Sequence, residues 1–305
     1  MVDTKIRPML ALSEPVLPED LNPEAGPWWV SPKLDGIRSL AMHKEMRSRT
    51  LKPHPNLHMR SVMAHLALHG MDGEITVGPA NAPDCINATT SGINSIKGEP
   101  DFMYNVFDRW DIPEIGYKTR LSYLRRQVLY AQREGLPVRL LPQELCTTIE
   151  EVRAVVERNY DEGYEGSIIR SYDGIYKYNR STFREGLLLK VKEYTDFEVH
   201  VTEFIEMTHN DNEATIDERG YTKRSTHKAN KRPAGTLGKM KGVRVDTGDI
   251  VTIGTGKMTA EEKLYVWTHQ DEFLGAFAKC RSGKHGVKDK PRFPRWIVWR
   301  DPNDM

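Results

Sequence analysis

The sequence predicts an α+β domain with largely antiparallel sheets, followed by a small β-barrel domain. Its 305 residues are enough for two domains, since a domain typically has about 100–200 residues. In the first two thirds of the chain, strand-like and helix-like segments do not alternate regularly as they do in parallel α/β folds. After about Tyr194, short strand-like segments dominate. We therefore expect two domains, residues 1–195 and residues 196–305.

Short runs rich in β-branched and aromatic residues predict the strands of the first domain. They occupy residues 28–30, 38–42, 73–77, 102–107, 167–171 and 187–191. A helix is predicted where four apolar residues recur on one face: Leu121, Leu124, Val128 and Ala131. A second helix is expected to begin at Thr148, which forms a capping-box pattern with Glu151, and to end at Gly163.

The second domain shows apolar alternation in residues 197–201, 243–245, 251–253 and 296–298. A helix-like stretch, residues 260–279, interrupts these segments, and residues 235–238 (GTLG) resemble a turn. Trp296 and Trp299 are expected to pack on opposite sides of the last strand. Four or five short strands with one helix are typical of a small Greek-key barrel, the OB fold.

The charge distribution indicates a polyanionic partner. The net charge is only +1, but Lys and Arg outnumber Asp and Glu in the C-terminal third, and the reverse holds before it. Residues 221–244 contain eight Lys or Arg and no acid. Five of these cations lie in a predicted loop and are candidates for contacts with a nucleic-acid backbone: Lys223, Arg224, Lys228, Lys231 and Arg232.

Composition also limits the compartment. No apolar stretch approaches the roughly 18 residues of a membrane span, so no membrane association is expected. The three cysteines are scattered and form no CxxC pair, which is typical of a reduced, intracellular protein. We expect a cytoplasmic protein.

Lys33 is the strongest candidate for a catalytic residue. It lies in the segment SPKLDGIRS, directly after a predicted strand. Gly36 allows a sharp turn, and Arg38 can return to the same side of the sheet, so two cations can meet a phosphate. The alternative is a surface strand end followed by an ordinary Asp-Gly turn, and this segment alone does not decide between them.

Further segments supply the remaining groups of a nucleotide site. MDGE places Glu74 at the start of a strand, and YNVFD places Phe107 at the end of another. EGYEGSIIR places Glu165 at the mouth of a strand, and LLLKVK puts Lys190 and Lys192 on one strand face. A nucleophile, two carboxylates, a ring for stacking and several cations suit a nucleotide with a divalent metal.

In this order, the segments resemble the nucleotidyltransferase motifs of ATP-dependent DNA ligases, mRNA capping enzymes and RNA ligases. RFPRWIVWRD near the C-terminus resembles the last motif of DNA ligases, and RPMLA resembles their N-terminal strand. The resemblance is strongest to the small two-domain ligases of bacteriophages and bacteria. It implies a nucleotidyltransferase (adenylation) domain followed by an OB-fold DNA-binding domain, with ATP and Mg²⁺, or Mn²⁺, as cofactors. We expect nicked double-stranded DNA as the substrate and a monomer that needs no protein partner, in a bacterial or phage-infected cytoplasm.

The resemblance also implies a role for each site residue. Lys33 would be adenylated, AMP would pass to the 5′-phosphate at a nick, and the 3′-hydroxyl would then attack with AMP leaving. The remaining roles are as follows: Arg38 and Arg49 would contact the sugar and phosphates or the 5′-phosphate of the nick, Glu74 the ribose or the metal, Phe107 the adenine, Glu165 the metal, Lys190 and Lys192 the α-phosphate, and Arg300 the pyrophosphate. The cations and the metal would disfavour the ammonium form of Lys33 and stabilise the leaving group.

The sequence departs from the family pattern at two sites. Ser31 stands where many members have a glutamate that reads the adenine amine, and Pro32 beside it lacks an N–H donor. The final motif ends in RDPN, without the lysine that often closes it. Adenine selection and pyrophosphate binding must therefore use other groups.

Three alternatives remain open. An mRNA guanylyltransferase also has K-x-D-G-x-R, but RFPRWIVWRD argues against this alternative, and labelling by ATP rather than GTP would separate the two. An RNA ligase is disfavoured by the barrel-like C-terminal third. A non-catalytic OB-type nucleic-acid-binding protein would explain the basic segment but leaves Lys33, Glu74 and Glu165 without a purpose.

Overall fold

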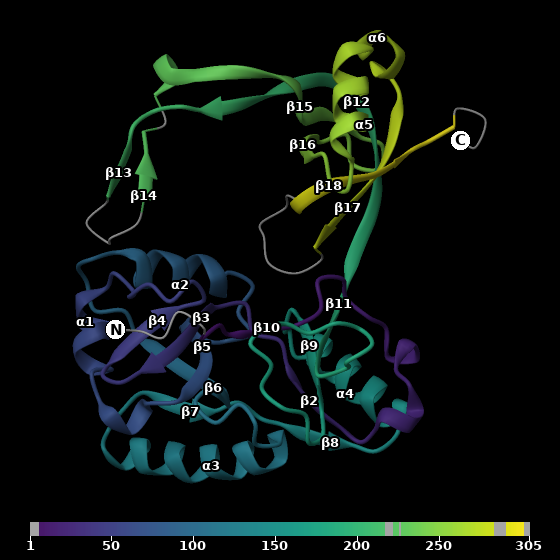
Figure 1. Cartoon of the computed structure of the whole chain (residues 1–305). Coiled ribbons are helices and arrows are strands. Elements are labelled where there is room, and N and C mark those ends of the chain that lie inside the picture. The colour runs from purple at the N-terminus through teal and green to yellow at the C-terminus, as the bar shows by residue number, and fades with distance from the viewer. Residues whose placement is uncertain (1–5, 217–221, 226, 284–290, 302–305) are drawn as a thin grey trace. The chain divides into compact units, whose positions relative to one another are not determined.

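The computed structural model describes residues 6–216, 222–225, 227–283 and 291–301. The chain divides into two compact units, Met1–Lys192 and Glu193–Met305, here called the N-terminal and C-terminal units (Figure 1). The sequence placed this division three residues later. Each unit is described by itself.

The N-terminal unit contains two main sheets. The first has the order β11-β9-β2-β8 and is antiparallel throughout. Its strands are β2 (Trp28–Pro32), β8 (Glu144–Cys146), β9 (Gly166–Ser171) and β11 (Leu188–Lys192). The second has the order β4-β3-β5-β6-β7, in which only β6 and β7 are parallel. Its strands are β3 (Ile37–Met42), β4 (Glu45–Ser48), β5 (Met71–Val77), β6 (Phe102–Arg109) and β7 (Val138–Leu140).

All six strands predicted in the first domain are present, each within two residues of its expected ends. The sequence patterns missed the short strands β4, β7 and β8. They also missed a two-stranded parallel pair, β1 (Met9–Leu10) with β10 (Asn179–Arg180). These strands are too short to show a period of their own.

Four α-helices accompany the sheets: α1 (Leu57–Val62), α2 (Cys85–Asn94), α3 (Tyr117–Arg133) and α4 (Ile149–Asp161). Short 3₁₀ helices lie at η1 (Pro18–Asp20), η2 (Pro23–Ala25) and η3 (Leu66–Leu68). Helix α3 buries the predicted apolar face in a core shared with α1, α2 and the five-stranded sheet. Helix α4 begins at the predicted capping box, where Thr148 Oγ1 accepts from the Glu151 N–H at 3.2 Å, and Gly163 follows it at a φ of 87°.

The C-terminal unit is built around a closed barrel of order β12-β15-β16-β18-β17. The strands are β12 (Tyr194–Asn210), β15 (Lys231–Arg244), β16 (Ile250–Gly254), β17 (Phe277–Gly283) and β18 (Arg292–Trp299). Neighbours are antiparallel except β16 and β18, and α5 (Ala260–Thr268) lies between β16 and β17 in the sequence. This is the five-stranded arrangement of an OB fold, so the predicted fold class is confirmed.

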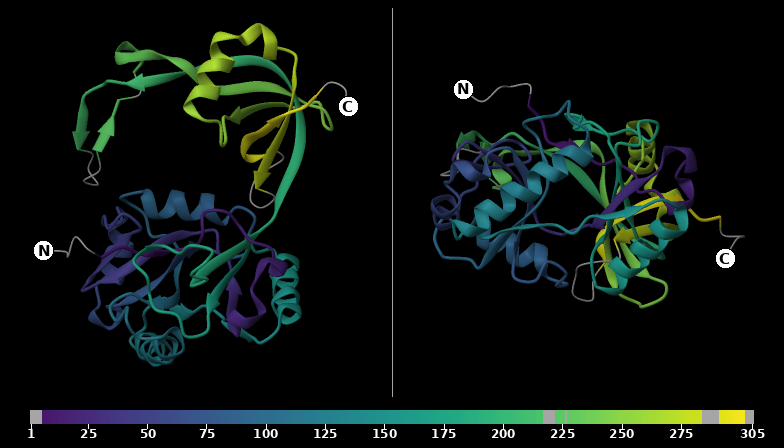
Figure 2. Two further views of the ribbon diagram at one scale, coloured as in Figure 1. Left: turned by 45° about the vertical axis from the view of Figure 1, so that its right-hand side comes forward. Right: turned by 90° about the horizontal axis from the view of Figure 1, so that it is seen from below.

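Strands β12 and β15 continue beyond the barrel as a two-stranded extension, residues 206–237, here called the arm (Figures 1 and 2). The arm also carries β13 (Ala214–Ile216), β14 (Thr222–Arg224) and η4 (Lys228–Asn230). The predicted basic loop and the turn at residues 235–238 were therefore wrong. Bulges in the pairing accommodate Pro233 and Gly235, and a Cβ on Gly238 would lie 2.8 Å from the Met207 backbone, so this glycine permits close strand contact.

Two further expectations were wrong. The predicted helix 260–279 ends early: α5 stops at Thr268, α6 (Gln270–Phe273) is a single turn, and β17 follows Gly275, which has a φ of 84°. Trp296 and Trp299 do not lie on opposite sides of β18. A bulge in the β17–β18 pairing brings both indoles to the barrel core, with ring centroids 6.1 Å apart.

The α4 cap gives a test of this local structure. Thr148→Ala removes the side-chain acceptor at the N-terminus of α4, and we expect it to lower the free energy of unfolding in urea by about 1 kcal/mol. Thr119→Ala is the control, because Thr119 is exposed inside α3 and alanine is a good helix former there. Equal stability of Thr148→Ala and the wild type would contradict the capping role.

Candidate active site

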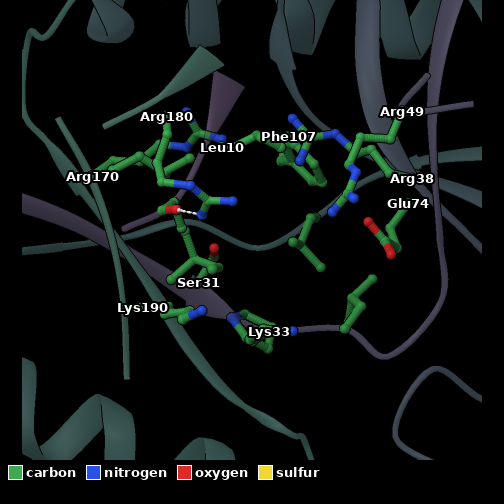
Figure 3. A pocket seen from close by; sticks show the side chains of 16 residues that line it. Leu10, Ser31, Lys33, Arg38, Arg49, Glu74, Phe107, Arg170, Arg180 and Lys190 are labelled. Carbon is green, nitrogen blue, oxygen red and sulfur yellow. Dashed lines mark hydrogen bonds between the residues drawn. The ribbon is translucent and has the colours of Figure 1, made fainter. Parts of the chain in front are cut away.

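A pocket of about 250 Å³ lies between the two sheets of the N-terminal unit (Figure 3). Residues from β2, β9 and β11 line one side, and residues from β3, β5 and β6 line the other. Lys33 follows β2 directly, and its backbone N–H donates to the Gly166 carbonyl oxygen at 2.8 Å. The turn after it needs glycine, because a Cβ on Gly36 would lie 2.3 Å from the Ile75 carbonyl oxygen. The main chain therefore holds the candidate nucleophile at the pocket.

The amine of Lys33 forms an ion pair with Glu165. One carboxylate oxygen of Glu165 accepts from Lys33 Nζ, and the other accepts from Lys192 Nζ. Burial alone would raise the pKa of Glu165, but the charges of Lys33 and Lys192 outweigh it and lower this pKa to about 2. A carboxylate with so low a pKa is a poor proton acceptor. In this structure Glu165, predicted as a metal ligand, forms ion pairs with Lys33 and Lys192 and orients the Lys33 amine.

Arg38 is fixed on the opposite side of the pocket. Its Nε and Nη2 donate to the two carboxylate oxygens of Asp72 at 2.5 and 2.6 Å. The hydroxyl of Tyr176 donates to Asp72 at 2.6 Å and accepts from the Met9 N–H at 3.0 Å. The guanidinium of Arg38 lies 4.6 Å from the centroid of the Phe107 ring. A bidentate pair of this kind is geometrically specific, so Arg38 and Phe107 form a prearranged wall.

Glu74 points into the pocket from β5 (Figure 3). Burial raises its pKa to about 7, against the opposing charges of Arg38 and Lys33. Asp72 and Glu165 raise this pKa further through their negative charges. Near neutral pH, Glu74 can therefore gain or lose a proton within the site.

The other predicted pocket residues are also present. Lys190 lines the pocket and is partly buried, and burial together with the charges of Lys33, Arg180 and Lys192 lowers its pKa. Arg49 is exposed and lines the pocket near Arg38 (Figure 3). Ser31 is buried and lines the pocket from β2.

The structure adds two arginines that the sequence patterns missed. Figure 3 shows Arg170 and Arg180 across the pocket from Arg38 and Arg49. Arg170 is two residues after Ile168 on β9, so both side chains lie on the same face of the strand. This spacing could have indicated that Arg170 faces the pocket. No local pattern marked Arg180, whose Nη1 donates to the Ala11 carbonyl oxygen at 2.6 Å.

Arg170 is held by buried charge. Its Nη1 donates to Asp108 at 2.6 Å, and Arg120 donates to the same carboxylate at 2.8 Å. Within the described part of the chain, the buried Nε of Arg170 has no hydrogen-bond partner. A spare donor in the wall of a pocket suits an anionic or carbonyl-bearing ligand.

The remaining predicted residues lie in the C-terminal unit. Arg300 directly follows β18, and its Nε donates to Glu198 at 2.7 Å. The five predicted DNA contacts are on the arm: Lys223 and Arg224 in β14, Lys228 in η4, and Lys231 and Arg232 in β15. Arg224 donates to the Asn212 carbonyl oxygen, and Arg232 pairs with Asp211 at 2.6 Å.

Known proteins share this architecture. The family model of the ATP-dependent DNA ligase domain matches residues 8–192. The structure of Chlorella virus DNA ligase-adenylate has 28% sequence identity and a TM-score of 0.54, and the match covers 98% of this chain and 99% of that one. A Lig E DNA ligase, described as binding DNA with a minimal scaffold, has a TM-score of 0.69, 20% identity and coverage of 98% and 100%. At that identity it shows the fold alone. Comparison with curated protein sequences found no match.

The family match spans more than half of the chain and contains every pocket residue described above. The similarity to a ligase-adenylate extends over nearly the full length. The chain therefore belongs to the ATP-dependent DNA ligases, which seal DNA through a covalent adenylate.

Proposed function

We propose that this ligase seals 5′-phosphate/3′-hydroxyl nicks in duplex DNA, with Lys33 as the residue that carries AMP. The main support is the placement of Lys33 at a pocket that also holds Arg38, Glu74 and Lys190. As a free amine, Lys33 Nζ would attack the α-phosphorus of ATP, and the bond to the bridging oxygen would break as pyrophosphate leaves. AMP would then pass to the 5′-phosphate, and the 3′-hydroxyl would displace it.

The ion pair between Lys33 and Glu165 must break before Lys33 can attack ATP. Glu165 is paired with the Lys33 amine, and only an unprotonated, unpaired amine is nucleophilic. A metal ion on Glu165 would draw this carboxylate away from Lys33. Lys190 and Lys192 would then remain as the cations that bind the α-phosphate and stabilise negative charge on the leaving group.

Glu74 and Glu165 would be the carboxylate ligands of a Mg²⁺ ion. Within the described ranges, no three His, Cys, Asp or Glu side chains gather as a ligand group. Mg²⁺ is commonly held by one or two carboxylates and substrate phosphates, so two carboxylates beside a triphosphate are sufficient. When bound, the ion would neutralise phosphate charge. Mn²⁺ has similar ligand preferences and would substitute for Mg²⁺.

The remaining pocket residues would bind the nucleotide and the nick. Phe107 would stack on adenine, with Arg38 behind its ring, and the Ser31 hydroxyl is available where other ligases have an acid. Arg38 and Arg49 would contact the sugar and phosphates or the 5′-phosphate of the nick. Arg300 is proposed to orient pyrophosphate, which would require it to leave Glu198.

We further propose that the C-terminal unit binds DNA and that the chain acts as a cytoplasmic monomer in DNA repair, replication or recombination. Among the described helices, none is long and apolar enough to cross a membrane. Cys85, Cys146 and Cys280 are free and buried, which suits a reducing compartment.

Lys33→Ala and Lys33→Arg should abolish the protein–AMP adduct formed with labelled ATP and Mg²⁺, because neither variant offers a free amine. Labelled GTP should not label the wild type. Lys44→Ala, at an exposed lysine in the turn after β3, is the control and should retain the adduct. Mass mapping of AMP to any lysine other than Lys33 would overturn the assignment.

Glu74 should titrate near pH 7 in carboxyl ¹³C NMR of the protein without nucleotide. Because the folded protein holds this proton more tightly than the unfolded chain does, the free energy of unfolding should fall as pH rises from about 4.5 to 7. Glu74→Gln should remove that part of the pH dependence, whereas Glu157→Gln, at an exposed position on α4, should keep it. Parallel stability profiles for the wild type and Glu74→Gln would contradict the raised pKa.

Neutralising Lys223, Arg224, Lys228, Lys231 and Arg232 together should weaken binding to nicked duplex regardless of sequence. Each lost phosphate contact should reduce the slope of log affinity against log salt by about 0.9. Formation of the Lys33 adduct should be unchanged. Neutralising Arg125, Arg126 and Arg133 on the exposed face of α3 is the control for loss of charge. If the salt slope stays at the wild-type value in the arm variant, the arm is only a charged surface.

A further inference from the structure

A second cavity, here called the aromatic cavity, lies in the C-terminal unit between α5, α6 and β18. Its volume is about 380 Å³. Four rings line it: Tyr265, Phe273, Trp296 and Trp299. The bulge in the β17–β18 pairing places Trp296 and Trp299 on the same side of β18, so that both can line the aromatic cavity.

The rings form a connected surface. The centroid of Phe273 lies 4.9 Å from that of Trp299 and 6.1 Å from that of Tyr265. Trp296 is buried in the barrel core, whereas Tyr265 is 48% exposed. The aromatic cavity therefore has a rigid inner end and an accessible outer side.

Carboxylates stand beside these rings. Glu261 and Glu262 line the aromatic cavity, and the Tyr265 hydroxyl donates to Glu272 at 3.1 Å. Residues 261–272 contain four acids and one lysine, in a part of the chain that is otherwise basic. The local charge therefore attracts cations and repels phosphates.

We propose that the aromatic cavity binds an organic cation, an alkylammonium or guanidinium group. The negative faces of aromatic rings attract such cations, and sites built from several rings use this to recognise them. A nucleobase could also stack on these rings, but its phosphate would approach Glu261 and Glu262. An uncharged apolar ligand would gain nothing from the acids.

The test uses the indole N–H signals of the ¹⁵N-labelled full chain. The six tryptophans include Trp28, Trp29 and Trp110 in the N-terminal unit, which serve as internal references. Trp296→Phe and Trp299→Phe assign the two signals of the aromatic cavity. Tetramethylammonium is the probe, tert-butanol is its neutral isostere, and NaCl matches the ionic strength. We expect tetramethylammonium alone to shift the Trp296 and Trp299 signals, with saturation.

Two variants then test the chemistry. Glu261→Gln removes a carboxylate and Tyr265→Leu removes a ring, and both positions are exposed on α5, so the barrel core is spared. Tyr265→Leu should weaken binding by roughly two- to thirty-fold, the range of single cation–π contacts, and Glu261→Gln should weaken binding through the loss of a negative charge. Tyr130→Leu, at a tyrosine 52% exposed on α3, is the matched control and should bind as the wild type does.

Spermidine and acetyl-Gly-Arg-Gly-amide separate the possible sources of the cation. Tighter binding of spermidine would identify a free polyamine, and tighter binding of the peptide would identify a basic side chain of a partner protein. Three results would overturn the proposal: equal shifts with tert-butanol, unchanged affinity in both variants, or no saturable shift of either indole signal.

Discussion

Pairing of buried charge determines how the N-terminal unit is assembled around its pocket. Asp72 and Asp108 are fully buried, and an unpaired carboxylate in such a position would be strongly destabilising. Asp72 is satisfied by Arg38 and Tyr176, and Asp108 by Arg120 and Arg170.

These pairs tie together segments that are far apart in the sequence. Because Arg38 and Arg170 also line the pocket, the contacts that stabilise the fold also fix these two pocket cations. Breaking either cluster would leave a buried charge and displace a pocket wall at once. The arrangement limits the rotamers of the arginines before any ligand arrives, which lowers the entropy cost of binding an anion.

Sequence patterns identified the site residues that are marked by their immediate sequence neighbours. Lys33 and Glu165 could be recognised because each lies at a strand end, with a glycine one to three residues further on. Their ion pair joins residues 132 positions apart, and no local pattern predicts such a contact. Arg180 was missed for the same reason, since only the pairing of β10 with β1 brings it to the pocket. In the arm, Pro233 and Gly235 have the composition of a loop, but bulges keep them within a strand.

The arm has a mechanical consequence. Strand β12 runs from Tyr194 to Asn210, and β15 from Lys231 to Arg244, so each passes from the arm into the barrel wall without an intervening loop. A force applied at the far end of the arm is therefore carried to the barrel along the paired strands β12 and β15. The register shifts near Glu206 interrupt the hydrogen-bonded ladder, so the arm bends most easily there. Deflection of the arm that these shifts do not absorb would be transmitted to the barrel, because β12 and β15 are also barrel strands.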